Sequence, residues 1–245
     1  MIIKLLHHLI KYIPFNCLRI FSLRLLGVKI GRKVKIKWGS LICNNVQIGN
    51  SCIISRNCII GKEVYIGNSV HIEPSVTIYY SKIGDDVIIG EFARITNLIV
   101  NNRTQIERDV ICTGFQHGKI YIGSDTYIGI GAILDWSGNL IIGNYVHIAG
   151  PSTGLWTHSS IKQALNGDEL KNNKNKLVGS IEIKDKVWIG GNCTIYPGIK
   201  ISTCSIILPN SVVNRNIKSF TMVGGTPCKK IRDIKLIKNE YTFNK

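Results

Sequence analysis

Isoleucine recurs every six residues along the N-terminal part of the chain, and this period restricts the possible fold more than any other feature. Seven isoleucines follow it without a break: Ile42, Ile48, Ile54, Ile60, Ile66, Ile72 and Ile78. Four residues after each of the first six lies a small or β-branched residue, namely Val46, Cys52, Cys58, Val64, Val70 and Val76. An α-helix repeats about every 3.6 residues and an amphipathic strand every two, so neither produces this pattern. A fixed short period indicates one structural unit stacked on itself.

The same register continues almost to the C-terminus. It resumes at Ile83 after the deletion of one residue, and its later members are Ile89, Ile95, Ile122, Ile128, Ile142, Ile148, Ile183, Ile189, Ile195, Ile201 and Ile207. In a repeat such as Val187-Trp188-Ile189, strand alternation turns the first and third side chains inward and the middle one outward. Three short strands joined by corners close one triangular coil, and stacked coils bury a column of aliphatic side chains. The period therefore predicts an all-β fold, a parallel β-helix of hexapeptide repeats.

Glycine often follows the isoleucine of a repeat, as at positions 49, 61, 67, 84, 90, 123, 129, 143 and 190. A tight corner needs backbone conformations with positive φ, which Gly and Asn adopt at little cost. We therefore expect the residue after each isoleucine to turn the corner with positive φ.

The length and the cysteines indicate one elongated domain in a reducing compartment. The 245 residues suit a solenoid with appendages, because a solenoid lengthens without a larger globular core. The eight cysteines include no C-x-x-C pair, and Cys52, Cys58 and Cys193 occupy the inward small-residue position. We interpret these three as reduced core residues of a cytoplasmic protein, and not as disulfides or zinc ligands.

The N-terminal segment, residues 1–30, is basic and apolar. The chain carries a formal net charge of +16, and the stretch before Glu63 holds eleven Lys and Arg with no Asp or Glu. A membrane-spanning helix is not expected, because His7, Lys11 and Pro14 interrupt the apolar runs. A signal peptide also fits poorly, since the segment lacks a clean apolar core and a small-residue cleavage site. The pattern predicts two short amphipathic helices with a break near Pro14.

Two roles are open for these helices, and both can hold together. In one, they rest peripherally on the anionic inner face of the cell membrane, with their basic residues toward lipid headgroups. In the other, they cover the open end of the solenoid, as a terminal coil requires. Nucleic-acid binding is a third use of such charge, but the chain contains no recognised nucleic-acid motif, so we expect no nucleic-acid partner.

The longest interruption of the repeat runs from about Leu155 to Ser180 and is strongly polar. We expect it to leave the coil as an extruded loop, and loops on a rigid scaffold commonly carry function. His158 lies at its root. A histidine can take a proton from a hydroxyl or an amine near neutral pH, which is the work of a general base. A surface histidine without a function is the alternative.

Beyond these patterns, the sequence resembles a known family. The hexapeptide runs, the histidine loop and the stretches VWIGGNCTIYPGIKI and MVGGTPCKKIR resemble the hexapeptide acyltransferases. Within that family, the chain is most similar to the galactoside and maltose acetyltransferases and the polysaccharide O-acetyltransferases. The polysaccharide group is resembled most in GVKIGRKVKI and ILDWSGNLIIGNYVHIAG. The likeness covers residues 27–235. It implies a left-handed β-helix, a homotrimer with active sites between neighbouring prisms, and acetyl-CoA as co-substrate without a metal.

The resemblance assigns roles to residues of this chain. His158 matches the family's catalytic base, which deprotonates the acceptor hydroxyl for direct attack on the thioester. Trp188 matches a tryptophan beside the reactive end of the cofactor. Gly191 matches the residue whose main-chain N–H steadies the oxyanion. The chain departs from the family at Leu208-Pro209, where a Gly-Ala pair usually leaves room for the pantetheine arm.

Basic residues near the C-terminus match the family's contacts to CoA phosphates. Arg215, Lys229 and Arg232 are the matching positions, and a 3′-phosphate and a pyrophosphate need cations or N–H donors. Lys218 and Lys230 are weaker candidates, for which a solvated basic tail is the alternative.

Asp135 is the next candidate for the catalytic site. It precedes His158 by 23 residues, a little more than one coil of three hexapeptides, so we expect it one coil below. There it would hold the imidazole tautomer and favour the imidazolium, or bind the acceptor. A corner aspartate that caps a turn is the alternative. Asn139 and Trp156 are further candidates for binding the acceptor.

Together these observations predict an acetyl-CoA-dependent O-acetyltransferase that acts in the cytoplasm on a sugar hydroxyl of a cell-surface polysaccharide or its lipid-linked precursor. N-acetylation of a nucleotide-activated amino sugar is the alternative on the same fold, and a non-catalytic β-helix scaffold is a further one. A zinc enzyme of the γ-carbonic anhydrase type needs a tight histidine pair. That pair is missing from the available set, His71, His117, His147 and His158.

The expected organisation of the chain has three parts. Residues 1–30 form the N-terminal segment, and residues 31–217 form the β-helix with its extruded loop at about 155–180. Residues 218–245 form a basic tail that binds CoA phosphates.

Overall fold

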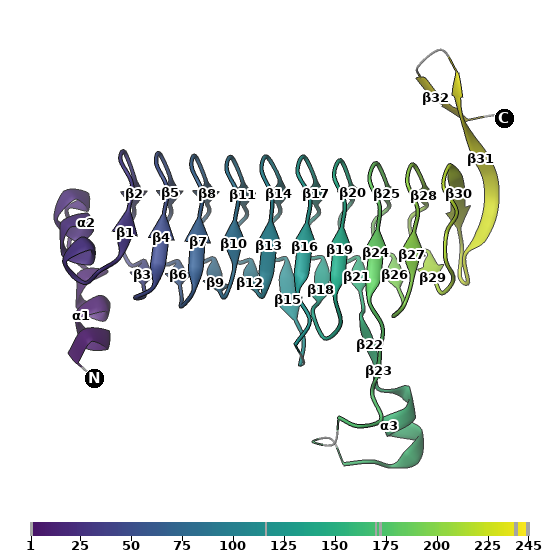
Figure 1. Cartoon of the computed structure of the whole chain (residues 1–245), viewed down its shortest axis with the longest axis horizontal. Coiled ribbons are helices and arrows are strands. Elements are labelled where there is room, and N and C mark those ends of the chain that lie inside the picture. The colour runs from purple at the N-terminus through teal and green to yellow at the C-terminus, as the bar shows by residue number, and fades with distance from the viewer. Residues whose placement is uncertain (1, 116, 170, 172, 238–239, 244–245) are drawn as a thin grey trace.

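Each coil of the chain adds one short strand to each of three parallel sheets, which are the faces of a long triangular prism (Figure 1). Neighbouring coils pair in register, isoleucine beside isoleucine, as in Ile48 with Ile66 and Ile54 with Ile72. The predicted hexapeptide β-helix is therefore confirmed. This computed structural model describes residues 2–115, 117–169, 171, 173–237 and 240–243.

The strands follow one another around the prism in a fixed order. Sheet 1 contains β1 (Lys29–Ile30), β4 (Val46–Ile48), β7 (Val64–Ile66), β10 (Lys82–Ile83), β13 (Leu98–Val100), β16 (Ile120–Ile122), β19 (Leu140–Ile142), β24 (Ile181–Ile183) and β27 (Lys200–Ile201). Sheet 2 contains β2 (Lys35–Ile36), β5 (Ile53–Ile54), β8 (His71–Ile72), β11 (Ile88–Ile89), β14 (Gln105–Ile106), β17 (Tyr127–Ile128), β20 (His147–Ile148), β25 (Trp188–Ile189), β28 (Ile206–Ile207) and β30 (Thr221–Gly224). Sheet 3 contains β3 (Leu41–Ile42), β6 (Ile59–Ile60), β9 (Thr77–Tyr79), β12 (Arg94–Thr96), β15 (Ile111–Thr113), β18 (Ile133–Asp135), β21 (Gly154–Leu155), β26 (Thr194–Ile195) and β29 (Val212–Val213).

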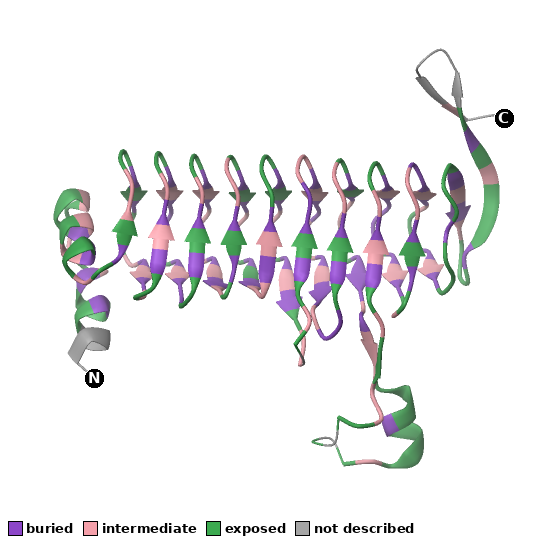
Figure 2. Ribbon diagram, viewed as in Figure 1, coloured by how far each residue is buried: buried purple, intermediate pink, exposed green. Residues whose placement is uncertain are grey.

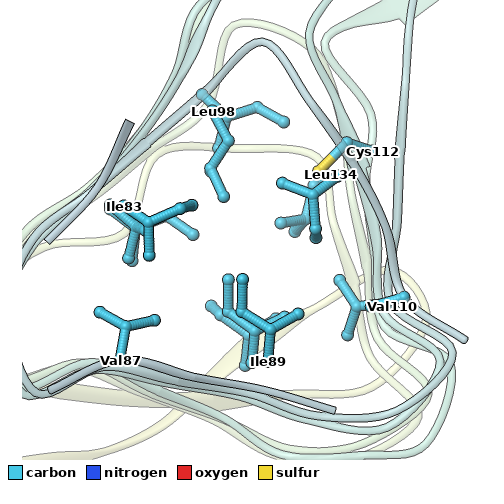
Figure 3. Packing of buried hydrophobic residues seen from close by; sticks show 14 of the residues in the cluster. Ile83, Val87, Ile89, Leu98, Val110, Cys112 and Leu134 are labelled. Carbon is cyan, nitrogen blue, oxygen red and sulfur yellow. The ribbon is translucent and has the colours of Figure 1, made fainter. Parts of the chain in front are cut away.

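Aliphatic side chains from all three sheets fill the prism. Figure 3 shows Ile83, Ile89 and Leu134 pointing toward one another across its interior. Every isoleucine of the first uninterrupted run is buried, and so are Cys52, Cys58 and Cys193, at the predicted inward position. These cysteines are free thiols. The repeat therefore builds a continuous hydrophobic column, which is the main stabilising feature of a solenoid.

The corners differ from the expectation. Positive φ falls on the third residue after the isoleucine, as at Ser51 (58°) and Asn57 (58°), and not on the glycine that follows it directly. That glycine is needed for space, because a Cβ on Gly49 would lie 2.4 Å from the carbonyl oxygen of Gly67 in the next coil. The expectation was wrong because it treated each corner alone, whereas stacking at about 4.8 Å brings adjacent corners into contact.

Two helices, α1 (Ile2–Ile10) and α2 (Asn16–Leu25), lie at the N-terminal end of the prism, in purple in Figure 1. The break between them includes Pro14, as expected. Among the residues that the structure describes, no helix is long and apolar enough to cross a membrane.

Polar side chains of α2 cover the open edge of sheet 2. The amide of Asn16 donates to the Val34 carbonyl (3.1 Å) and accepts from the Ile36 N–H (2.9 Å). The guanidinium of Arg19 donates to the carbonyls of Ile36 and Ile13. Because β2 is the terminal strand of its sheet, these bonds satisfy groups that would otherwise remain unpaired. The helices therefore cap the solenoid.

The coils continue past residue 217, where we expected the β-helix to end. β30 pairs in parallel with β28, with Met222 beside Ile206. The chain then reverses, and β31 (Lys229–Ile237) runs antiparallel to β30 and forms a hairpin with β32 (Glu240–Phe243) (Figure 1). The tail is thus an extension of sheet 2.

Candidate active site

The chain leaves the prism between β21 and β24, at the corner that joins sheet 3 to sheet 1 (Figure 1). Leu155 belongs to β21 and is fully buried, so the extruded segment comprises residues 156–180. Its stems pair as the antiparallel strands β22 (His158–Ser159) and β23 (Leu177–Val178). Beyond them lies α3 (Ile161–Asn166), and most of this outer part is exposed (Figure 2). The strand pairing fixes His158 at the root of the loop.

His158 contacts the buried carboxylate of Asp135. The distance from Nδ1 of His158 to Oδ2 of Asp135 is 2.6 Å, and Asp135 has 0% of its surface exposed. The carboxylate also accepts hydrogen bonds from the N–H groups of Thr157 and Ser137, each at 2.9 Å, and from the Ser137 hydroxyl at 2.6 Å. Asp135 ends β18, the strand beside β21, so one coil separates it from His158, as the spacing predicts.

Hydrogen bonds keep the Asp135 carboxylate ionised in spite of its burial. Burial raises the pKa of Asp135, but the hydrogen bonds from Ser137 and His158 together outweigh it, so that pKa lies below its ordinary value. An ionised carboxylate only accepts hydrogen bonds, so Nδ1 of His158 carries the proton and donates it. Nε2 is then the ring nitrogen left to take a proton. The geometry is that of a histidine oriented for general-base work.

An aromatic side chain from a neighbouring coil packs against the imidazole. The ring centroids of Phe115 and His158 lie 4.8 Å apart in an edge-on contact at 78°. Nζ of Lys176 lies 4.1 Å from the centroid of the Phe115 ring. Such contacts favour one orientation of the histidine ring. Phe115 was missed from the sequence, and the signal for it was an aromatic residue within a break of the repeat.

His158 lines a pocket of about 550 Å³ at the base of the loop. The pocket residues are mostly apolar and are Trp156, His158, Ser159, Ile161, Leu177, Val178, Gly179, Tyr196, Pro197 and Gly198. Apolar walls with a few polar groups are typical of small-molecule sites. Trp156, an expected acceptor contact, is among them. Tyr196 was missed, although it directly follows the inward Ile195.

Asn139 lies at the same corner of the prism as the loop root, one coil earlier, but it does not line this pocket. Its Oδ1 atom accepts a hydrogen bond from the Lys119 N–H at 3.2 Å. Its carbonyl accepts from the N–H of Ile181, where the loop returns to the prism, at 2.9 Å. Asn139 therefore borders the root of the loop.

Trp188, on sheet 2, and Gly191, at the corner that follows it, both lie apart from the corner that bears His158. Trp188 is half-buried in β25, beside His147, and Gly191 lies where the chain turns from sheet 2 to sheet 3. A Cβ on Gly191 would lie 2.2 Å from the carbonyl oxygen of Gly150, so a larger residue does not fit without a shift. The root of the His158 loop joins sheet 3 to sheet 1. The structure therefore does not bring these candidates together within one chain.

The basic candidates lie farther along the prism than His158, toward its C-terminal end. Arg215 follows β29, at the same corner of the prism as the His158 loop. It is two rungs along sheet 3 from β21, through β26 to β29, or about 10 Å at about 4.8 Å per rung. Lys229 and Arg232 lie on β31, and the weaker candidate Lys230 pairs with Asp233 at 2.8 Å.

Leu208 and Pro209 fill the corner where the family usually has a smaller pair. They follow β28, and Pro209 packs over Gly190: a Cβ on that glycine would lie 2.5 Å from the Pro209 nitrogen. Leu208 is half-buried beneath the final coil, where a Cβ on Gly224 would lie 3.1 Å from it. Bulky side chains thus occupy this stretch of the surface.

None of the other histidine candidates is among the residues that line the loop pocket. The ring of His147 stacks on that of Tyr127, with the ring centroids 4.5 Å apart. The Nε2 atom of His71 lies 3.5 Å from Oε1 of Glu73. His117 is exposed. Within the described part of the chain, no group of three or more His, Cys, Asp and Glu side chains is placed to hold a metal ion.

Known proteins share both sequence and fold with this chain, although no protein-family model matches it. It is 30% identical to galactoside O-acetyltransferase of Escherichia coli K12 over 130 residues, which are 53% of this chain and 62% of that protein. It is 32% identical to chloramphenicol acetyltransferase of Klebsiella aerogenes over 116 residues, which are 46% of this chain and 51% of that protein. The matched part of the chain therefore covers between 51% and 62% of the length of these relatives.

A solved structure shares the β-helix. UDP-N-acetylglucosamine acyltransferase of Arabidopsis superimposes with a TM-score of 0.58 at 17% identity, over 84% of this chain and 70% of that one. At this identity the likeness concerns the fold alone. The fold is the left-handed parallel β-helix that the sequence resemblance implied.

Proposed function

Since the chain is related to the hexapeptide-repeat acyltransferases, we propose that it is an acetyl-CoA-dependent O-acetyltransferase for a sugar hydroxyl of a cell-surface polysaccharide or of its lipid-linked precursor. The observation that carries the proposal is the 2.6 Å contact between His158 and buried Asp135 in the loop pocket. The galactoside O-acetyltransferase relative, by its name, acylates a sugar oxygen, which favours a hydroxyl acceptor.

In the proposed reaction, His158 is the general base. Its Nε2 atom takes the proton of the acceptor hydroxyl while that oxygen attacks the thioester carbon of acetyl-CoA. The C–O bond forms, the C–S bond breaks, and the imidazolium returns the proton to the departing CoA thiolate. Asp135 accepts the hydrogen bond from Nδ1–H of His158 and stabilises the imidazolium. General-base help of this kind contributes about 10²–10⁴-fold in rate.

A homotrimer completes the site in this proposal. Trp188 on sheet 2 and Gly191 at the corner after it lie apart from the corner of His158, so a neighbouring copy supplies them. The main-chain N–H of Gly191 then steadies the oxyanion, and Trp188 contacts the reactive end of the cofactor. Closed cyclic symmetry brings one corner of each prism against a different corner of the next, so every site is equivalent.

The cations near the C-terminus suit the phosphates of CoA. Arg215 and Lys229 are exposed, and with Arg232 they supply charge for the 3′-phosphate and the pyrophosphate. Leu208 and Pro209 occupy the corner that the family leaves open, so the pantetheine arm passes outside these two side chains.

The acceptor binds in the loop pocket, against Trp156, with Asn139 at the same corner of the prism one coil earlier. We place the reaction in the cytoplasm, where acetyl-CoA is available and thiols stay reduced. Free, buried Cys52, Cys58 and Cys193 fit that environment.

A binding measurement and an acceptor panel test the proposal. CoA at about 100 times its Kd stabilises a protein that binds it by about 2.7 kcal/mol, which a thermal shift detects. Thiol release from acetyl-CoA is then measured with galactosides, other hydroxylated sugars, chloramphenicol and nucleotide-activated amino sugars. Release with sugar hydroxyls supports the proposal. Release with the amino sugars alone replaces it with N-acetylation, and the absence of any CoA stabilisation contradicts acyl transfer.

A further inference from the structure

The cap helix α2 packs one face against the prism and exposes an apolar face on its other side. Arg19 and Leu23 face the first coils and are each 2% exposed. Leu18, Phe21 and Leu25 follow one another at helical spacing on the opposite side and are 51%, 60% and 71% exposed. A capping role explains the first face. It leaves the second face unexplained.

Other large apolar side chains at this end of the prism are also exposed. Leu9, Tyr12, Phe15 and Trp38 are each more than half exposed. The rings of Tyr12 and Trp38 lie 5.5 Å apart, which joins the end of α1 to the first coil. We name this surface the end face and define it as Leu9, Tyr12, Phe15, Leu18, Phe21, Leu25 and Trp38. Exposed apolar surface gathered in one place marks an interaction site.

A basic cavity adjoins the end face. It has a volume of about 660 Å³ and is lined by Pro14, Asn16, Arg19, Lys35, Ile36, Lys37, Trp38 and Arg56. A neighbouring cavity adds Lys33. No Asp or Glu precedes Glu63 in the sequence, so the positive charge around the cavity has no nearby acidic residue of this segment to offset it. Lysine and arginine clusters beside an apolar surface attract phosphate-bearing headgroups.

From this juxtaposition we propose that the end face docks on an anionic phospholipid bilayer, with lipid phosphates at Lys35, Lys37 and Arg56. Apolar side chains enter the headgroup and acyl boundary while the cations stay at phosphate level. Tyr12 and Trp38 suit that boundary, since aromatic rings with a polar group favour it. The charges select the bilayer over a second copy, because two end faces would bring like charges together.

Docking in this way leaves the candidate active site accessible. Six rungs of sheet 3 separate β3 from β21, in the order β3, β6, β9, β12, β15, β18 and β21. At about 4.8 Å per rung, the His158 loop root stands about 29 Å along the prism from the first coil. A bilayer at the end face therefore does not cover the loop pocket.

Flotation of the full chain with lipid vesicles tests the proposal. One vesicle population is pure phosphatidylcholine, and the other contains about one third phosphatidylglycerol. We expect at least tenfold stronger binding to the anionic vesicles, reduced by high salt because exposed charges are screened. Equal binding to both populations, or binding to neither, overturns the proposal.

Matched variants distinguish binding through the end face from nonspecific hydrophobic binding to vesicles. Leu18→Ser with Phe21→Ser is expected to weaken binding at least tenfold, since it removes exposed apolar side chains and leaves Arg19 and Leu23 in place. Phe92→Ser with Leu165→Ser removes apolar side chains elsewhere that are at least half exposed, and this double variant should bind like the wild type. Loss of binding in both double variants, or in neither, contradicts a specific end face. A change in mass by light scattering for the first pair alone would assign the face to a second copy instead.

The basic cavity has its own test. Each cation at an anionic surface contributes about fivefold, so Lys35→Ser with Lys37→Ser should weaken binding about 25-fold. Lys82→Ser with Lys119→Ser is the matched control, because both residues are exposed at a distance from the end face. Inorganic phosphate at millimolar concentration should not release the protein from vesicles. Full release by phosphate, or equal effects of both lysine pairs, would show that the cavity is not a headgroup site.

Discussion

His158 and Asp135 are joined by a 2.6 Å contact across one coil of the prism, between a partly exposed imidazole and a carboxylate with no exposed surface. Asp135 belongs to β18 of sheet 3, and His158 to the stem of the extruded loop. The stacking of the coils therefore sets the position of Asp135, while the paired stems of the loop set that of His158. A rigid scaffold thus holds the proposed base at the edge of the loop pocket.

Replacing Asp135 by asparagine should lower kcat about 10²-fold. The amide no longer stabilises the imidazolium or fixes the tautomer of His158, and general-base catalysis depends on both. The KM for acetyl-CoA should stay near its wild-type value. Asp109→Asn, at an exposed corner, is the control and should keep the wild-type kcat. A wild-type kcat for D135N would remove Asp135 from the mechanism.

The lowered pKa of Asp135 predicts a loss of stability in acid. A group whose pKa is lowered by folding contributes stability above its unfolded pKa of about 3.9, and this contribution disappears as pH falls through the folded value. The free energy of urea unfolding should therefore fall more for the wild type than for Asp135→Asn between about pH 5 and about pH 3. Equal losses for both proteins would mean that the carboxylate is not ionised in the folded state.

The burial of the core thiols predicts a graded reactivity of cysteines. Burial raises the pKa of Cys58 to about 11 and that of Cys112 to about 12. A thiolate-directed reagent should modify the exposed Cys17 quickly and reach Cys58 and Cys112 only after unfolding. Mass spectrometry of peptides, with a sample in urea as reference, locates the modified sites. Rapid modification of Cys112 in the folded protein would contradict the stacked core.

The glycine of a corner should tolerate no side chain. Gly49→Ala places a Cβ 2.4 Å from the Gly67 carbonyl oxygen, so we expect destabilisation of about 1–3 kcal/mol from overpacking. Ser51→Gly, at a φ of 58° in the same corner, should be tolerated within about 1 kcal/mol because glycine adopts positive φ freely. Urea unfolding measures both variants. A neutral Gly49→Ala would show that adjacent coils separate readily at this corner.

Most of the prism was predictable from the sequence because its period is local and repeats many times. Each isoleucine from Ile42 to Ile78 faces inward as the alternation required, and the same spacing placed Asp135 one coil below His158. The corners were harder to predict. The role of Gly49 comes from a contact with Gly67 in the next coil, which a rule about single turns does not contain.

The surroundings of the histidine could not be derived in the same way. Phe115 belongs to a stretch where the repeat is broken. The six-residue period therefore does not predict the direction of its side chain, which depends on the path of that stretch. The Ser137 hydroxyl reaches Asp135 only because the chain turns immediately after β18. The repeat fixes the positions of Trp188 and Gly191 on the prism, and both lie away from the corner of His158. Spacing within one chain does not show which copy's site they would serve.

The most direct test of the account is the turnover of His158→Ala beside its affinity for CoA. Without the imidazole the acceptor hydroxyl keeps its proton, so kcat should fall by about 10²–10⁴-fold, while the Kd for CoA, measured by calorimetry, stays unchanged. His117→Ala, an exposed histidine outside the pocket, is the matched control and should retain full turnover. A His158→Ala variant with near-normal turnover would contradict the central claim that this histidine is the base.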